Sequence, residues 1–287
     1  MIPSAFDYEA PATVAEALTL LADDSREVKV LAGGQSLLPV LKLRMADPEL
    51  VVSLQQIDEL RGVRMEDQTL VIGAMTRHAD VAREPLIGAH APLLARAAAE
   101  IADPQVRHRG TIGGAVVHAD PASDMPATLC ALEAQMQVVG PSGQRTVPAA
   151  EFFEDFFTTV VEEDELLTAI RVPSYDDWGI GYEKFTRVAQ QWPIVSVAAM
   201  VRLEGGSIAE ARVALGNMDT VPVRAAGVEA ALSGAAPTQE AVAAACASAA
   251  EGTNPTEDLN GDATYRRHLA TVLARRAVLA AVADAGA

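Results

Sequence analysis

Two pairs of adjacent glycines are the residues whose type and spacing say most about chemistry in this chain. Gly33 and Gly34 follow one apolar run of β character, and Gly113 and Gly114 follow a second. We therefore expect each pair to form a bend at the end of a strand. Glycine lets backbone N–H groups approach an anion closely and adopt positive φ angles. Two converging loops of this kind would suit a diphosphate. Short hydroxyl donors stand beside them at Ser36, Thr111 and Ser123.

Several other kinds of site find no support in the sequence. It contains no G-x-G-x-x-G motif, no P-loop and no G-x-S-x-G elbow. Nothing in the sequence places Ser, His and Asp into a catalytic triad, and His118 and Asp120 lack a third convergent donor, so we predict neither a triad nor a metal site. Cys130 and Cys246 are too few for an iron–sulfur cluster, and we expect both to be buried, reduced thiols.

The charge balance narrows the choice of partners. The 287 residues include 22 basic and 39 acidic side chains, which give a net charge of −17. Nucleic acids and anionic membranes both require clustered lysine and arginine, so neither is expected as a partner. We also expect no signal peptide and no transmembrane segment, and hence a cytoplasmic protein.

The pattern of apolar residues predicts an α+β protein. Helices are expected over 13–23, 76–81, 92–101, 126–133 and 149–157, and strands over 28–31, 50–54, 70–75, 135–139 and 166–172. Residues 39–45 are expected to be a connection. Four phenylalanines fall on one face of 149–157, which favours a core stripe over a wall for a flavin. A boundary is expected at 173–181. Beyond it, three strands (182–187, 194–203 and 209–215) precede helices over 221–232, 238–250 and 265–285.

Further strings give the chain a resemblance to a known family. They are MIPSAFDY at 1–8, EFF at 151–153, YEKF at 182–185, and DLNGD at 258–262 followed by YRR at 265–267. With both glycine loops, they resemble the FAD-binding medium subunits of molybdenum hydroxylases (the xanthine oxidase-like family). Within that family they are most similar to the medium subunits of aerobic carbon monoxide dehydrogenases.

The resemblance implies a domain organisation. A two-part PCMH-type FAD-binding domain would cover 1–175, with parts at about 1–53 and 54–175. A C-terminal α+β domain, with a three-stranded antiparallel sheet and helices, would cover 178–287.

The resemblance also implies cofactor contacts, position by position. The first diphosphate loop matches Ala32, Gly33, Gly34, Gln35, Ser36 and Leu37, and the second matches Thr111, Gly113 and Gly114, whose amides and hydroxyl would bind the diphosphate. Sugar hydroxyls would be held by Ser123 and Asp124, and the flavin or adenine would meet Ile101, Val106 and Leu167. Lys184 would lie near the isoalloxazine ring, His118 would hydrogen-bond the cofactor, and Trp192 would cover one face of the ring. Ala115 departs from the asparagine that is common after the second glycine pair.

Plainer structural roles remain open for the same residues. Ile101, Val106 and Leu167 suit an ordinary core, and Lys184 suits a solvent-facing strand position. Asp124 has the residue type of a helix N-cap. Trp192 suits packing between domains.

The function implied by the resemblance is electron transfer, so no catalytic side chain is expected in this chain. This chain would carry FAD, while a small subunit would carry two [2Fe–2S] clusters and a large subunit the molybdenum cofactor, in a dimer of heterotrimers. The medium subunit would pass electrons from the clusters to a respiratory quinone or another acceptor, with CO and water converted to CO2 elsewhere in the complex. The complex would be cytoplasmic or at the inner face of the membrane.

Alternatives to this function stay open. They are a related hydroxylase acting on an N-heterocycle, ketone or purine, a stand-alone flavin oxidase, and a non-catalytic module. We also hypothesise that the last helix meets a partner through Arg266, Arg267, Arg275 and Arg276.

Overall fold

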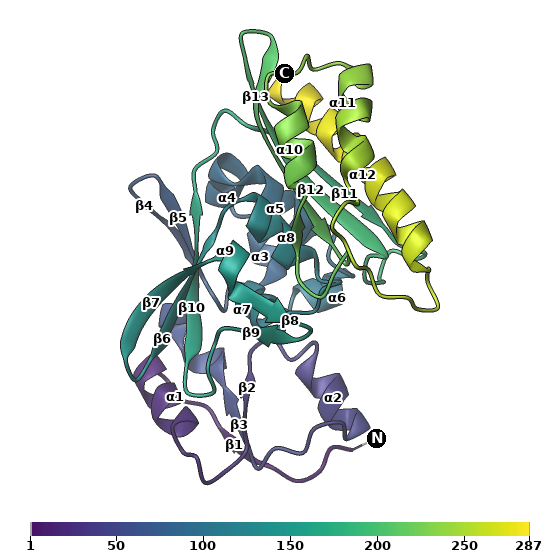
Figure 1. Cartoon of the computed structure of the whole chain (residues 1–287). Coiled ribbons are helices and arrows are strands. Elements are labelled where there is room, and N and C mark those ends of the chain that lie inside the picture. Colours follow the sequence, from purple (N-terminus) through teal and green to yellow (C-terminus); the bar gives the residue numbers. More distant parts are fainter. Residues whose placement is uncertain (1, 287) are drawn as a thin grey trace.

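The N-terminal part of the chain forms a small parallel sheet. The computed structural model describes residues 2–286, and its first sheet has the strand order β1–β3–β2, with β1 at Asp7–Glu9, β3 at Leu50–Ser53 and β2 at Val28–Leu31. Helix α1 (Val14–Leu21) begins where expected, because the Thr13 hydroxyl accepts from the amide of Glu16 at 3.2 Å. Helix α2 (Leu37–Leu43) occupies the segment expected to be a connection. Figure 1 shows this part at the bottom of the molecule.

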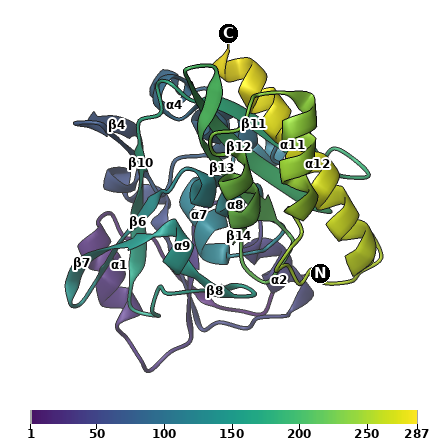
Figure 2. The ribbon, with the colours of Figure 1, turned by 45° about the horizontal axis from the view of Figure 1, so that its top comes forward.

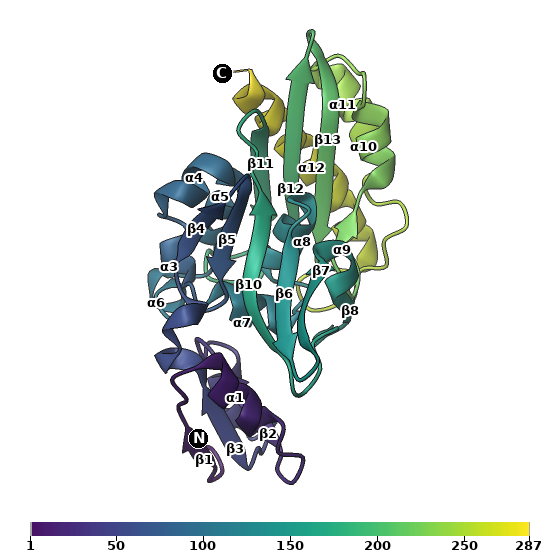
Figure 3. The ribbon, with the colours of Figure 1, turned by 90° about the vertical axis from the view of Figure 1, so that its left-hand side faces the viewer.

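A five-stranded antiparallel sheet forms the middle of the molecule. Its order is β4–β5–β10–β6–β7, with β4 at Val63–Glu66, β5 at Thr69–Gly73, β10 at Leu166–Pro173, β6 at Gln135–Gly140 and β7 at Gly143–Pro148. Short 3-10 turns at Leu54–Gln56 and Asp58–Leu60 link it to the first sheet. Its helices are α3 (His78–Val81), α4 (Pro85–His90), α5 (Pro92–Ala99), α6 (Pro104–Arg107), α7 (Ile112–His118) and α8 (Asp124–Ala131). Figure 3 shows the sheet lying beside these helices.

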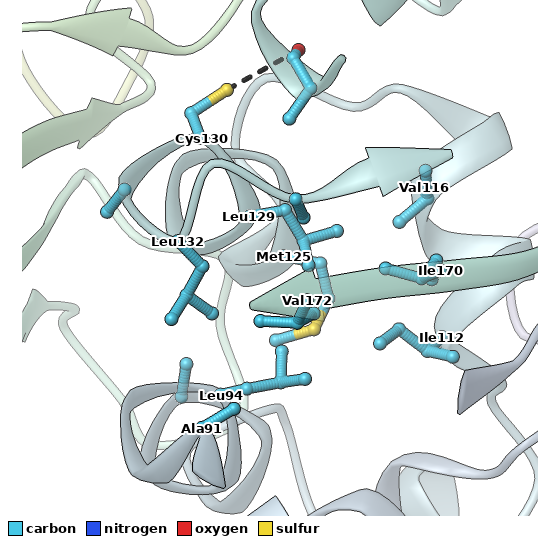
Figure 4. Packing of buried hydrophobic residues seen from close by; sticks show 14 of the residues in the cluster. Ala91, Leu94, Ile112, Val116, Met125, Leu129, Cys130, Leu132, Ile170 and Val172 are labelled. Carbon is cyan, nitrogen blue, oxygen red and sulfur yellow. Dashed lines mark hydrogen bonds between the residues drawn. The ribbon is translucent and has the colours of Figure 1, made fainter. Parts of the chain in front are cut away.

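The core of this middle part is apolar and well filled. Met125 and Leu129 of α8 pack against Ile170 and Val172 of β10, as Figure 4 shows. Cys130 is buried there, and its thiol donates to the carbonyl of Ala149 at 3.6 Å. Burial raises the pKa of Cys130 to about 12 and that of Cys246 to about 11, so the expectation of buried thiols is confirmed.

The C-terminal part is an antiparallel sheet covered by helices. Strands β11 (Gly179–Phe185), β12 (Val195–Glu204), β13 (Ser207–Gly216) and β14 (Val223–Arg224) lie in that order, under α10 (Ala226–Leu232), α11 (Gln239–Ala245), the 3-10 turn Cys246–Ser248 and α12 (Ala263–Ala285). A Cβ on Gly181 would lie 2.0 Å from the carbonyl oxygen of Ala277, so only glycine lets α12 pack this closely on β11. The expected three strands are present, and a two-residue fourth strand, β14, extends them.

The other face of this sheet packs on the middle part. Tyr182, Ala198, Met200 and Ala214 share one buried cluster with residues of α5 and α8. Helix α8 contacts β12 and β13. Figure 2 shows α11 and α12 lying side by side in the C-terminal part. The two parts therefore share a continuous apolar interface.

Two further expectations, one for residues 149–157 and one for the last helix, are corrected. The helix expected over 149–157 is α9 (Ala149–Phe152) followed by a hairpin of β8 (Phe153–Asp155) and β9 (Thr158–Thr159). Phe152 and Phe153 are buried, whereas Phe156 and Phe157 are exposed because the chain reverses between them. The four arginines of the last helix do not form one surface for a partner. Arg266 is buried and paired inside the chain, while Arg275 and Arg276 are exposed.

Candidate functional site

One cavity collects almost all of the predicted cofactor residues. It has a volume of about 420 Å³ and lies where the first sheet meets the middle part. Every residue expected to contact the cofactor lines it except Lys184: Ala32, Gly33, Gly34, Gln35, Ser36, Leu37, Ile101, Val106, Thr111, Gly113, Gly114, His118, Ser123, Asp124, Leu167 and Trp192. None of the phenylalanines of 149–157 lines this cavity, which removes the flavin-wall interpretation.

The first glycine pair forms the expected bend at a strand end. Strand β2 ends at Leu31, and Gly34 has a φ of 74°, which favours glycine. Within residues 2–286, the amides of 33–36 donate to no protein acceptor, although this segment borders the cavity. Successive free N–H groups form an anion-binding nest. The first loop therefore has the donors that a diphosphate requires.

The second glycine pair differs from its expectation. Gly113 and Gly114 lie in the first turn of α7, not at a strand end, and their amides are already used. The Gly113 amide donates to the Ala74 carbonyl at 2.8 Å, and the Gly114 amide donates to the Thr111 hydroxyl oxygen at 3.2 Å. That hydroxyl still has its own proton to donate. The second loop thus offers a hydroxyl and a surface without side chains rather than a second set of free amides.

The two glycine loops touch each other, as expected for two loops that converge on one diphosphate. A Cβ on Gly33 would lie 2.3 Å from the carbonyl oxygen of Arg109 and 2.7 Å from the Cα of Gly110. A Cβ on Gly113 would lie 2.6 Å from Ala74. These two glycines are therefore needed for close packing of the backbone, whereas a Cβ on Gly114 would meet only side-chain atoms.

His78 is a cavity residue that sequence reasoning missed. It is 4% exposed, and its Nδ1 atom has no hydrogen-bond partner among residues 2–286. Its amide donates to the carbonyl of Gly110 at 3.0 Å, so it also supports the second loop. Burial, with a smaller contribution from the positive charge of Arg107, lowers the pKa of His78 to about 4. The ring is neutral at physiological pH, and no motif in the sequence indicated it.

The depressed pKa of His78 predicts a pH-dependent stability. Between its folded pKa of about 4 and the ordinary value of 6.5, the unfolded chain binds more protons, so stability falls as pH falls through this window. Between pH 7 and pH 4.5, the free energy of unfolding should fall in both proteins, and the fall should be about 2–3 kcal/mol smaller in His78→Gln than in the parent. Urea unfolding at both pH values measures the difference, and parallel losses in the two proteins would contradict the assignment.

Asp124 and Lys184 form a buried ion pair at the cavity wall. The Asp124 carboxylate is 2% exposed and accepts from the Lys184 ammonium at 2.9 Å and from the Tyr182 hydroxyl. Asp124 is not the N-cap of α8, because the N-cap position belongs to Ser123. Lys184 does not line the cavity and is not a solvent-facing residue either, since its side chain is 6% exposed.

The remaining residues of the cavity wall include buried apolar side chains, a histidine and an exposed tryptophan. Ile101 and Leu167 are buried, and Leu167 lies at a bulge in β10. Burial lowers the pKa of His118, so its ring is a neutral hydrogen-bonding group. Trp192 is 53% exposed at the mouth, so it is not packed between domains.

These features fit a dinucleotide with a central diphosphate. The first loop supplies free amides, the buried Nδ1 of His78 has no protein partner, and apolar walls suit aromatic rings. Among residues 2–286, no group of three metal-ligating side chains was found. In the same range, no helix is long and apolar enough to cross a membrane.

Comparison with known families agrees with this assignment. Residues 4–175 match the FAD-binding domain in molybdopterin dehydrogenase, and residues 180–281 match the CO dehydrogenase flavoprotein C-terminal domain. The chain therefore belongs to the FAD-binding flavoprotein subunits of the molybdenum hydroxylase family. The expected family and the order of its two folds are confirmed.

The similarity to individual relatives covers nearly the whole chain. The carbon monoxide dehydrogenase medium chain of Hydrogenophaga pseudoflava is 45% identical over 98% of both chains, and that of Afipia carboxidovorans is 38% identical over 99% of both. The structure of the Hydrogenophaga pseudoflava carbon monoxide dehydrogenase lacking the Mo-pyranopterin moiety has a TM-score of 0.96 at 47% identity, covering 99% of each chain. Quinoline 2-oxidoreductase from Pseudomonas putida has a TM-score of 0.95 at 32% identity, covering 99% of each chain.

Proposed function

We propose that this chain is the FAD-carrying electron-transfer subunit of an aerobic carbon monoxide dehydrogenase. The observation that carries the proposal is the 45% identity, over 98% of both chains, to a carbon monoxide dehydrogenase medium chain. The complex would oxidise CO with water to CO2. The substrate site, the molybdenum cofactor and two [2Fe–2S] clusters would lie on large and small partner subunits, in a dimer of heterotrimers.

The positions of the cavity residues support a separate role for each of them in binding FAD. Bound FAD supplies the exchange between one-electron and two-electron transfer. The amides of 33–36 would bind phosphate oxygens, with the Thr111 hydroxyl as a further donor. The neutral ring of His118 would hydrogen-bond the cofactor. Apolar contacts would come from Ile101, Val106 and Leu167, while Ser123 and Asp124 would hold sugar hydroxyls and Trp192 would cover the mouth.

Several finer points belong to the same proposal. The FAD-binding domain would cover 1–175 and the C-terminal domain 178–287. The external acceptor would be a respiratory quinone, reached in the cytoplasm or at the inner face of the membrane. A rival with specific support is another hydroxylase of this family, because the quinoline 2-oxidoreductase structure matches nearly as well. The substrate site would lie outside this chain in either case.

The colour of the purified chain tests the cofactor assignment. We expect a yellow protein that releases one FAD per chain on denaturation. A folded, colourless chain that takes up no added FAD would favour a non-catalytic module. Turnover of an organic substrate by the chain alone would favour a stand-alone flavin oxidase.

The native complex tests the assembly and the substrate. Native mass spectrometry and metal analysis should give a heterotrimer with molybdenum and iron. Reduction of its flavin by CO, but not by an N-heterocycle, would separate the two hydroxylase candidates.

A further inference from the structure

One wall of the cavity is held from the C-terminal part of the chain. Asp124 begins α8 in the middle part, whereas Lys184 and Tyr182 both lie on β11. The Lys184 ammonium donates to Oδ2 of Asp124 at 2.9 Å, and the Tyr182 hydroxyl donates to Oδ1. Both carboxylate oxygens are therefore anchored across the boundary between the two parts.

Lys184 also fixes a second segment of the same wall. Its ammonium donates to the carbonyl of Glu100 at 3.0 Å, and Glu100 precedes the cavity residue Ile101. Lys184 and Tyr182 do not line the cavity, whereas Asp124 does. Any influence of these two β11 residues on a bound ligand would thus pass through the wall segments that they hold.

The electrostatics make Asp124 sensitive to the loss of its partner. Burial raises the pKa of Asp124, and the positive charge of Lys184 opposes that rise. The nearby charge of Glu100 raises it further, and burial, with the charge of Asp124, holds the pKa of Tyr182 well above its ordinary value. Removing the Lys184 charge therefore favours the protonated form of the buried Asp124 carboxyl.

We propose that Lys184 and Tyr182 are positioning residues, through which the docked C-terminal domain sets the affinity of the cavity for FAD. They aim the Asp124 carboxylate so that its remaining lone pairs accept sugar hydroxyls, since an ionised carboxylate offers about four acceptor sites and two are occupied. The inference rests on the proposed function, because it takes FAD as the ligand.

The first test compares FAD affinity in the full chain. Lys184→Met keeps the length of the side chain and removes its charge, and we expect the Kd for FAD, measured by quenching of flavin fluorescence, to rise at least tenfold. Lys184→Arg should restore most of the affinity, and Tyr182→Phe should cause a smaller loss. An unchanged Kd in Lys184→Met would overturn the proposal.

A matched control separates positioning from general docking of the two parts. Arg224 lies on β14 and donates to the carbonyl of Cys130 at 3.1 Å, so it also joins the two parts, but it does not line the cavity. Arg224→Met should lower thermal stability while leaving the Kd for FAD within twofold of the parent. An equal loss of affinity in Arg224→Met and Lys184→Met would show a merely structural role.

A double-mutant comparison tests whether Lys184 acts through Asp124. In Asp124→Asn combined with Lys184→Met, no unpaired charge is buried, so this protein should fold even if Lys184→Met alone does not. We expect its Kd to equal that of Asp124→Asn alone. If the Kd of the double variant instead rises by the product of the two single-variant increases, Lys184 contacts FAD directly and the proposal fails.

The pH profile gives a readout that simple destabilisation would not move. As pH falls, the Kd of Lys184→Met should rise more steeply than that of the parent, because the variant lacks the positive charge that opposes the raised pKa of Asp124. A flat profile in Lys184→Met would count against the proposal. A parent chain that binds no FAD would refute the proposed function itself, which keeps the two failures apart.

Discussion

Gly114→Asp should give a folded protein that is almost free of FAD. Gly114 borders the cavity, and a Cβ there would lie 3.2 Å from Ala32 and 2.9 Å from the hydroxyl oxygen of Thr111. A carboxylate at this position would face the negative diphosphate. At about 4 Å and an effective dielectric constant of about 20, repulsion between two unit charges is about 4 kcal/mol, so we expect FAD affinity to fall at least a hundredfold.

Gly114→Asn is the matched control because it has the same shape without the charge. We expect it to keep a substantial part of the FAD, with both variants melting at similar temperatures as apoproteins. The ratio of flavin to protein absorbance and the circular dichroism melt measure these outcomes. Equal FAD loss in both variants would show that size, not charge, decides, and would argue against a diphosphate at this place.

Arg266→Met should cause the largest loss of stability among the charged positions of the last helix. Arg266 is 1% exposed, donates to the carbonyl of Ile194 at 2.6 Å and pairs with Asp258 at 2.8 Å. Methionine fills similar space but leaves these acceptors without their partner. We expect the free energy of unfolding to fall by about 3 kcal/mol, measured by urea unfolding of the full chain.

The same helix offers a control for this prediction. Arg275 and Arg276 are exposed, and Arg275→Met should change the free energy of unfolding by less than about 0.5 kcal/mol. A loss in Arg266→Met as small as this would contradict the importance of the buried guanidinium. Because Ile194 ends the loop that carries Trp192, Arg266→Met should also loosen the cavity mouth.

The sequence predicted the two-part architecture and the residues of the cavity better than it predicted their local structure. Gly33 and Gly34 were correctly placed at the end of a strand, because the apolar run before them has a clear β pattern. Gly113 and Gly114 were misplaced, since glycine disfavours helix by about 1 kcal/mol and a glycine pair therefore indicates a turn. Here the close contact of Gly113 with Ala74 overrides that preference.

Contacts between remote segments were the part that sequence could not supply. His78 has no motif around it, and only the fold brings it under the second loop. No pattern in the sequence pairs Lys184 with Asp124, which lies sixty positions earlier in the chain. The phenylalanine run showed a helical spacing, but the hairpin after Phe152 sends two of its members to the surface. Periodicity describes one segment at a time and carries no information on such pairings.

The burial of both cysteine thiols determines how the folded chain reacts with oxidants and alkylating reagents. Thiolate is the form that oxidants and alkylating reagents attack, and the pKa values of about 12 and 11 leave almost none of it at neutral pH. The folded chain is thereby protected from sulfenic acid formation at both positions. For the same reason, Cys130 and Cys246 report on breathing of their two separate cores, since each becomes reactive only when its own core opens.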